Sequence, residues 1–207
     1  MSFAKSTVVN ALTISRVPLV LLWAVLAVVS EFTGSAFAAV AACAAMLFSG
    51  LTDLWDGRLA RKWGVVSAFG KMADPLMDKI FYLVAFPTLV WLIARQGESS
   101  AHALAMLGFT VLYLLRDTWV TFLRSVGAMY GADVAAMWLG KVRTALSFPG
   151  AGWVYVYLAF HRFVPDVWGE RWLISCYAVE FALGVLTVVS VFTYTAAYMP
   201  SLRKSVG

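Results

Sequence analysis

The stretch from Phe32 to Thr52 contains no charged residue. It is long enough to cross the hydrocarbon core of a membrane, which takes about 20 apolar residues in a helix. The whole chain is 62% hydrophobic and 13% charged, whereas soluble domains are roughly 25% charged. The sequence therefore predicts an integral membrane protein, in which helices satisfy the backbone hydrogen bonds that lipid cannot.

Similar apolar runs occur along the rest of the chain. The predicted membrane spans are 10–30, 32–52, 80–94, 103–122, 144–160 and 173–198. We expect long basic connections after the second and fourth spans, and short or weakly charged ones after the first, third and fifth. No polar linker or low-complexity tract divides the chain. The prediction is an all-α polytopic membrane protein with about six transmembrane helices, forming a single domain over residues 1–207.

Lysine and arginine are unevenly distributed between the two predicted sides of the membrane. Arg95, Arg162 and Arg171 fall on one side, and the other 13 of the 16 basic residues fall on the side of both termini. The positive-inside rule places the basic side in the cytoplasm, as in a bacterial-type inner membrane. We therefore expect the termini and residues 53–78 to be cytoplasmic. Contact with anionic membrane lipids, and not with nucleic acid, explains the net charge of +5.

Four aspartates stand at helical spacing between the second and third spans. Asp53 and Asp56 are three residues apart, and Asp74 and Asp78 are four apart, so each pair shares one helix face. Carboxylates this close repel one another unless a cation neutralises them. Their oxygens suit a hard divalent ion such as Mg²⁺, together with substrate phosphates. The alternative is a solvated charged loop, but random loops do not set carboxylates at helical spacing.

The aspartates belong to a longer pattern, DxxDGxxARx8GxxxDxxxD, which runs from Asp53 to Asp78. Its remaining positions are Gly57, Ala60, Arg61 and Gly70. The pattern resembles the signature of the CDP-alcohol phosphatidyltransferases, with every defining position filled. Enzymes of that family move a phosphatidyl or similar phosphoryl group from a CDP-linked lipid to an alcohol and release CMP.

The resemblance implies a role for each position of the pattern. Asp53, Asp56 and Asp74, together with Asp78, would hold two Mg²⁺ or Mn²⁺ ions, and Asp78 would act as base on the acceptor hydroxyl. The residues implied to bind the CDP group are Asp53, Asp56, Gly57, Ala60, Arg61, Gly70 and Asp74. Their small members would give the nucleotide access to the helix backbone, and Arg61 would pair with phosphate or orient an aspartate. The resemblance also implies a homodimer.

Four basic residues on the predicted cytoplasmic side are candidates for binding an acceptor phosphate: Arg116, Arg124, Lys141 and Arg143. Arg116 lies within an apolar run, where an ionisable residue indicates a functional site. For Lys141 or Arg143 alone, the positive-inside bias is a sufficient explanation. The sequence predicts a basic pocket that would suit a phosphorylated alcohol.

The same region resembles the phosphatidylglycerophosphate synthase subgroup, which carries an R-[ED] pair, a nearby LR, and GKxKT followed by Gln. Here Asp117 is the shorter acid, and Ser147 stands where the Gln is expected. The resemblance implies transfer of a phosphatidyl group from CDP-diacylglycerol to glycerol 3-phosphate, with release of CMP. Inositol phosphate would need the same basic pocket and serine would need fewer cations, so both stay open as acceptors.

Two other classes of membrane protein are alternatives. Intramembrane prenyltransferases also use Asp-rich motifs with Mg²⁺, but they have more spans and two separated Asp clusters. A transporter or channel would place charges along a central path. This chain has one aspartate cluster, gathered next to Gly and Ala at one predicted surface.

Polar residues also occur in the first span, where Asn10, Thr13 and Arg16 form the pattern NxLTxxR. The pattern resembles the opening of phosphatidylglycerophosphate synthases. One interpretation is helix capping with an arginine that reaches to the membrane surface. The other is that this end of the helix lines the nucleotide pocket.

Three further ionisable residues lie towards the opposite side of the membrane or inside a span. His102 and His161 fall at predicted external ends without metal-ligand spacing, so we expect both to be surface residues. Glu180 lies within the sixth span, and the sequence identifies no partner for it.

Overall fold

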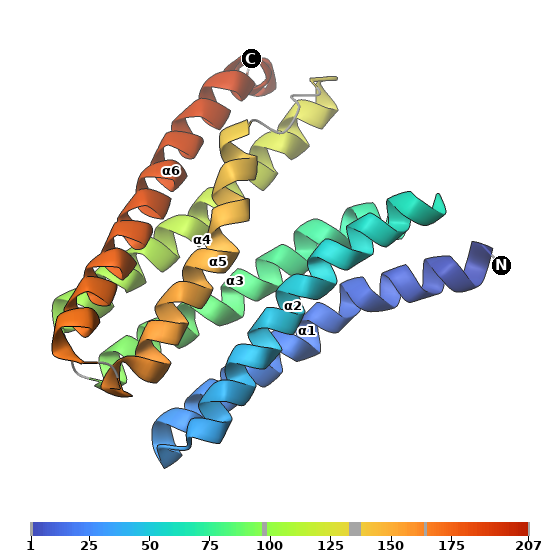
Figure 1. Cartoon of the computed structure of the whole chain (residues 1–207). Helices are drawn as coiled ribbons and strands as arrows, with labels where there is room; N and C mark the ends of the chain where they lie inside the picture. Colours follow the sequence, from blue (N-terminus) through green and yellow to red (C-terminus); the bar gives the residue numbers. More distant parts are fainter. Residues whose placement is uncertain (1, 97–98, 133–137, 164, 207) are drawn as a thin grey trace. The chain divides into compact units, whose positions relative to one another are not determined.

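The computed structural model describes residues 2–96, 99–132, 138–163 and 165–206, and contains helices but no strand in these ranges (Figure 1). Its elements are α1 (Ser2–Thr33), α2 (Ala36–Trp63), α3 (Ala68–Gln96), α4 (Ser100–Met129), α5 (Trp138–Phe160), a 3-10 turn η1 (His161–Phe163) and α6 (Asp166–Val206). All but α5 among the six α-helices are long and apolar enough to cross a membrane. The predicted all-α polytopic architecture is confirmed, while the crossing by α5 stays a prediction.

The connection between α2 and α3 is short, although the sequence predicted a long basic connection after the second span. That prediction is wrong because both helices continue past the apolar runs, so only residues 64–67 join them. Gly64 ends α2 in the left-handed region with φ of 64°, which glycine adopts without steric cost. The Ser67 hydroxyl accepts a 2.9 Å hydrogen bond from the Gly70 amide and so caps the first turn of α3.

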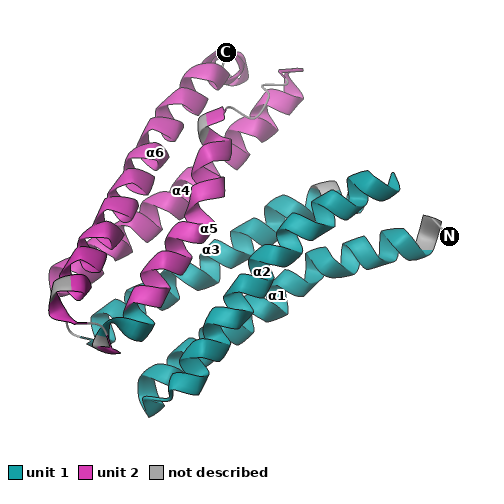
Figure 2. Ribbon diagram, viewed as in Figure 1, with its two compact units in different colours: residues 1–97, 158–162 teal, residues 98–157, 163–207 magenta. Residues whose placement is uncertain are grey.

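The chain forms two compact units (Figure 2). The first comprises residues 1–97 and 158–162 and contains α1, α2 and α3. The second comprises residues 98–157 and 163–207 and contains α4, most of α5, and α6.

In the first unit, α1 packs against both α2 and α3. The buried face of α2 consists largely of alanines, among them Ala38, Ala42 and Ala45. Small side chains let membrane helices approach closely, so that van der Waals contact can hold them together. Trp23 of α1 is fully buried in this unit.

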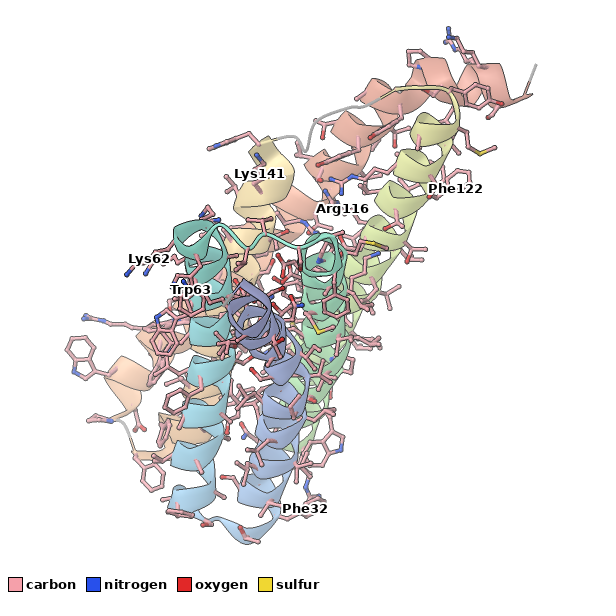
Figure 3. The ribbon with its side chains drawn as sticks, turned by 90° about the vertical axis from the view of Figure 1, so that its right-hand side faces the viewer. Phe32, Lys62, Trp63, Arg116, Phe122 and Lys141 are labelled. Atoms are coloured by element: carbon pink, nitrogen blue, oxygen red, sulfur yellow. The ribbon has the colours of Figure 1, made fainter. Side chains whose placement is uncertain are left out.

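The two ends of the first unit differ in chemistry. At one end Phe32 of α1 contacts Trp91 of α3, with ring centroids 5.6 Å apart. Figure 3 shows Phe32 at the opposite end from Lys62 and Trp63, which lie in the last turn of α2. The Trp63 ring lies 5.9 Å from Nζ of Lys5 near the start of α1. The predicted site residues of α2 and α3 lie towards this second, polar end.

In the second unit, α4 packs along α6. The buried residues Val120 and Leu123 of α4 form a cluster with Tyr194 and Tyr198 of α6. Gly127 of α4 makes this approach possible, because a Cβ atom there would lie 2.8 Å from Cδ1 of Tyr198. Contacts that close do not occur between real side chains, so the glycine is required for packing.

Two glycine substitutions in α4 test this packing. Gly127→Ala should lower the free energy of unfolding by about 1–3 kcal/mol, because the methyl group must displace the Tyr198 ring. Gly108→Ala is the matched control, since nothing lies within 4 Å of the position of its Cβ. It should be neutral or stabilise α4 by up to about 1 kcal/mol through helix propensity. Thermal unfolding in detergent measures both, and equal effects would contradict the packing role of Gly127.

Candidate functional site

The four predicted aspartates converge on a single arginine, Arg16 of α1. Its Nη1 lies 2.6 Å from Oδ1 of Asp53 and 3.6 Å from Oδ1 of Asp78. Its Nη2 lies 3.3 Å from Oδ1 of Asp74 and contacts Oδ2 of Asp56 directly. Asp53 and Asp56 come from α2, and Asp74 and Asp78 come from α3. The structure therefore brings all four motif carboxylates to one point, whereas helical spacing predicted only that the two members of each pair share a helix face.

This aspartate cluster is open to the surroundings on one side. The Asp56 side chain is 4% exposed, and that of Arg16 is 7% exposed. By contrast, Asp53 and Asp74 are about half exposed, at 52% and 51%, and Asp78 is 41% exposed. A buried pair thus forms the floor of the cluster, and three accessible carboxylates form its rim.

Asn10, Thr13 and Arg16 of α1 contact residues of the segment that carries the aspartates. The Thr13 hydroxyl donates a 2.8 Å hydrogen bond to Oδ2 of Asp56. The Ser67 hydroxyl donates to Oδ1 of Asn10 at 3.1 Å. Because Arg16 is buried among carboxylates, the interpretation that it reaches to the membrane surface is wrong. The other interpretation, that this end of α1 lines the nucleotide pocket, stays a prediction. The pairing of Arg16 with the aspartates was not predicted, although the spacing of Asn10, Thr13 and Arg16 at three-residue intervals puts them on one helix face.

The remaining motif positions lie on the same two helices as the aspartates. Gly57, Ala60 and Arg61 follow the aspartates of α2 along the helix. Arg61 is exposed, and its Nη1 would lie 3.6 Å from a Cβ on Gly57, which is an ordinary contact. A Cβ on Gly70 would lie 3.3 Å from Oγ of Ser67, so this glycine fits closely against the turn that begins α3. The role of these residues in binding a nucleotide stays a prediction.

The donor set of the cluster fits a hard divalent ion by its chemistry. All four groups are carboxylates, and one guanidinium leaves most of their negative charge uncompensated. In the described part of the chain, no three His, Cys, Asp or Glu side chains are placed to hold a metal ion as they stand. The point at which the carboxylates converge is taken by the Arg16 guanidinium instead.

The second unit contains an inverse arrangement, in which one carboxylate lies between two arginines. Asp117 Oδ1 accepts from Nη1 of Arg116 at 2.9 Å and from Nη2 of Arg143 at 2.5 Å. Arg116 Nε also donates to Oγ of Ser190 in α6 at 2.9 Å. Both arginines are buried. The structure therefore joins α4, α5 and α6 through Asp117 and its two partners, which we call the Asp117 network.

Two of the predicted acceptor-binding residues share an aromatic neighbour beside this network. The guanidinium carbon atoms of Arg116 and Arg124 lie 5.0 Å and 5.7 Å from the centroid of the Tyr194 ring. Gly140 lets α5 come close, because a Cβ there would lie 2.8 Å from the Tyr194 hydroxyl. Lys141 follows it and is exposed; Figure 3 labels it on α5, and Arg116 on α4.

Arg143 has hydrogen-bonding capacity to spare. Its guanidinium lies 4.0 Å from the centroid of the Tyr113 ring. The Tyr113 hydroxyl donates to Oγ of Ser147, which is the residue that stands where the subgroup has Gln. Nε and Nη1 of Arg143 are buried and find no hydrogen-bond partner among the described residues. Buried unpaired donors are costly, so Arg143 has donors available for a further hydrogen-bond acceptor.

Comparison with known proteins adds to this geometry. The family model described as CDP-alcohol phosphatidyltransferase matches residues 6–195. The chain belongs to the CDP-alcohol phosphatidyltransferase family. A relative from Escherichia coli (strain K12), named CDP-diacylglycerol–glycerol-3-phosphate 3-phosphatidyltransferase, is 28% identical over 158 residues, which are 74% of this chain and 77% of the relative. Proteins of the same name from Shigella sonnei (strain Ss046) and Shigella flexneri serotype 5b (strain 8401) match with the same identity and coverage.

One ionisable pair of this phosphatidyltransferase includes no predicted site residue. His102 is buried, with Nε2 3.0 Å from Oε1 of Glu180, so the prediction of a surface histidine is wrong. His102 also supplies the partner that the sequence did not reveal for Glu180. His161 is partly buried in the 3-10 turn. Beside Glu180, an apolar groove of about 620 Å³ runs between α4 and α6, lined by residues such as Phe109 and Val185.

Asp117 is the shared counter-charge of the two buried arginines Arg116 and Arg143. Asp117→Ala should lower the free energy of unfolding by about 3–5 kcal/mol, because it leaves two buried guanidiniums without their counter-charge. The neighbouring Thr118→Ala is the control: Thr118 is exposed, and its hydroxyl donates to the Leu114 carbonyl of its own helix. It should change stability by less than about 0.5 kcal/mol. Thermal unfolding of the two variants checks this, and a neutral Asp117→Ala would contradict the network.

Proposed function

We propose that this phosphatidyltransferase transfers a phosphatidyl group from CDP-diacylglycerol to glycerol 3-phosphate and releases CMP. The observation that carries the proposal is the convergence of Asp53, Asp56, Asp74 and Asp78 at one half-exposed point. The family of the chain and the printed names of its relatives agree with it. In the reaction, the acceptor hydroxyl oxygen bonds to the phosphatidyl phosphorus, and the bond from that phosphorus to the oxygen bridging the diphosphate breaks.

Within the aspartate cluster, Asp53, Asp56 and Asp74 would hold two divalent ions, Mg²⁺ or Mn²⁺, with Asp78 beside them. Such ions stabilise the negative charge that builds on a diphosphate as its bond breaks. Asp78 accepts the proton of the acceptor hydroxyl. Its side chain is 41% exposed and lies at the rim of the cluster, which suits a base that must reach a second substrate.

The residues that follow the aspartates bind the donor nucleotide in this proposal. Gly57, Ala60 and Gly70 leave the backbone of α2 and α3 accessible. Arg61 is exposed and carries a guanidinium that can bind two phosphate oxygens at once. The lipid tails of CDP-diacylglycerol stay in the bilayer, while CMP leaves into water.

The acceptor phosphate binds to the basic residues of the second unit. Arg143 offers two buried donors without a partner among the described residues, and Arg124 and Lys141 are exposed. Arg116 has its own partners in Asp117 and Ser190, so it holds the network together. Inositol phosphate is the alternative acceptor, because the same cations would bind its phosphate; serine would leave them unused.

We further propose that the aspartate cluster and both termini face the cytoplasm of a bacterial-type inner membrane and that the protein works as a homodimer. The uneven distribution of 16 Lys and Arg residues between the two sides supports the orientation. Single cysteines placed at Arg58 or Lys62 should resist an impermeant thiol reagent in intact cells. Ready labelling there would reverse the orientation.

The first activity prediction concerns divalent ions. Chelation should abolish CMP release from CDP-diacylglycerol, and added Mg²⁺ or Mn²⁺ should restore it, because the carboxylates alone repel the substrate diphosphate. Asp56→Asn should lower the rate at least about a hundredfold, in the range found for removal of one electrostatic catalytic group. Arg58→Gln, on the same helix but at a variable position of the motif, is the control and should keep most activity. Full activity in chelator would end the metal hypothesis.

The second activity prediction separates acceptor from donor. Arg124→Ala, Lys141→Ala and Arg143→Lys should each raise the KM for glycerol 3-phosphate by about tenfold to a hundredfold, the value of one charge-assisted contact. The KM for CDP-diacylglycerol should change little. Steady-state kinetics with each substrate varied in turn provides the measurement. If all three variants bind glycerol 3-phosphate normally, the basic residues do not bind the acceptor and reflect only the orientation of the protein in the membrane. If wild type uses inositol phosphate and not glycerol 3-phosphate, the basic pocket is supported but the proposed acceptor is wrong.

A further inference from the structure

Arg16 occupies the position at which a bound cation would be expected. Each terminal nitrogen of its guanidinium joins one carboxylate of α2 to one of α3. Nη1 lies between Asp53 and Asp78, at 2.6 Å and 3.6 Å. Nη2 contacts Asp56 and lies 3.3 Å from Asp74. The planar guanidinium presents its donors in a fixed fork, so its two terminal nitrogens can contact several carboxylates at once. The side chain thereby bridges the two helices, as a divalent ion bound by the same carboxylates would.

The charge and hydrogen bonding of the cluster are nevertheless incomplete. Four carboxylates surround one guanidinium, so a single positive charge is set against four negative ones. Like charges at this separation repel one another. In addition, Nε of Arg16 is buried and has no hydrogen-bond partner among the described residues. The arrangement therefore keeps the carboxylates together but leaves them able to attract more positive charge.

We propose that Arg16 is the resident counter-ion of the aspartate cluster: it holds the four carboxylates together while no divalent ion is bound, and it competes with the ion for the same oxygens. This inference rests on the divalent-ion site of the proposed function. It makes Arg16 a positioning residue, because it acts through Asp53, Asp56, Asp74 and Asp78.

Competition of this kind has two measurable consequences. An ion that binds must replace contacts that Arg16 already makes, so Arg16 weakens the apparent affinity for the ion. Arg16 also offsets the repulsion between carboxylates, so it stabilises the ion-free protein more than the ion-bound protein. A residue that only packs between helices would contribute equally to both states.

The test measures binding of Mn²⁺ alone to the purified full-length protein, by electron paramagnetic resonance of the free ion. Arg16→Met keeps the length of the buried side chain and removes its charge. It should bind Mn²⁺ about tenfold more tightly than wild type, since the ion no longer displaces a cation. Arg16→Lys keeps the charge but has a single ammonium group, which cannot contact all four carboxylates as the guanidinium does, so its affinity for Mn²⁺ should lie between those of wild type and Arg16→Met. Arg58→Gln removes a charge from the exposed face of α2 and is the control, with an affinity expected near that of wild type.

Thermal unfolding gives a second readout that does not depend on catalysis. Arg16→Met should unfold at a lower temperature than wild type in chelator, and saturating Mn²⁺ should close most of that gap. If Arg16→Met does not fold in chelator, Arg16→Gln, which is uncharged but still polar, replaces it in both experiments. It too should bind Mn²⁺ more tightly than wild type and unfold at a lower temperature in chelator.

The outcomes separate this inference from the proposed function. If wild type binds Mn²⁺ and Arg16→Met binds it equally or more weakly, Arg16 is not a competitor and the inference is overturned, while the metal site stands. If wild type binds no Mn²⁺ and CMP release survives chelation, both the metal site and the inference fail. Tighter binding with a larger ion-dependent stabilisation supports the inference.

Discussion

The ion pairs between Arg16 and four aspartates fix the geometry of the first unit. The guanidinium contacts two carboxylates of α2 and two of α3. These contacts fix the position of α1 along the axes of both helices. A slip of α1 by one helical turn would move the charge by about 5.4 Å and break all four contacts. Thr13 and Asn10 add hydrogen bonds to Asp56 and Ser67 on the same face of α1. Apolar packing alone would tolerate such a slip far better.

The second unit uses the opposite charge pattern for the same purpose. Asp117 stands between Arg116 and Arg143 and so joins α4 to α5, while Ser190 continues the contact into α6. Removal of the single carboxylate would leave two cations in a poorly hydrated setting, which is far costlier than loss of a surface pair. In each unit a single charged residue, Arg16 or Asp117, holds together several residues of the opposite charge. The opposite charges outnumber it, so they are not fully neutralised by it.

The sequence predicted part of this arrangement and missed the rest for physical reasons. The helical class followed from hydropathy, and short, local spacing predicted that Asp53 and Asp56 share one helix face and that Asp74 and Asp78 share another. The partners Arg16 and Asp56 are 40 positions apart, and His102 and Glu180 are 78 apart; such pairings depend on how helices are rotated against one another. Helices that are apolar on nearly every face give little sign of that rotation. Hydropathy predicts the part of a helix that crosses the hydrocarbon core, and not where the helix itself begins or ends. The end of α2 at Gly64 and the start of α3 after Ser67 could therefore not be predicted from it.

The order of the ion-paired residues along the chain bears on how the protein enters the bilayer during synthesis. Chains are made from the amino terminus, so α1 and α2 exist before α3. The buried members of the cluster, Arg16 and Asp56, lie on these first two helices. They can therefore neutralise each other as a helical hairpin, and neither charge stays unpaired while the later helices are made. The half-exposed Asp74 and Asp78 arrive afterwards and join a pair that already exists, which makes the α1–α2 hairpin the natural first step of assembly.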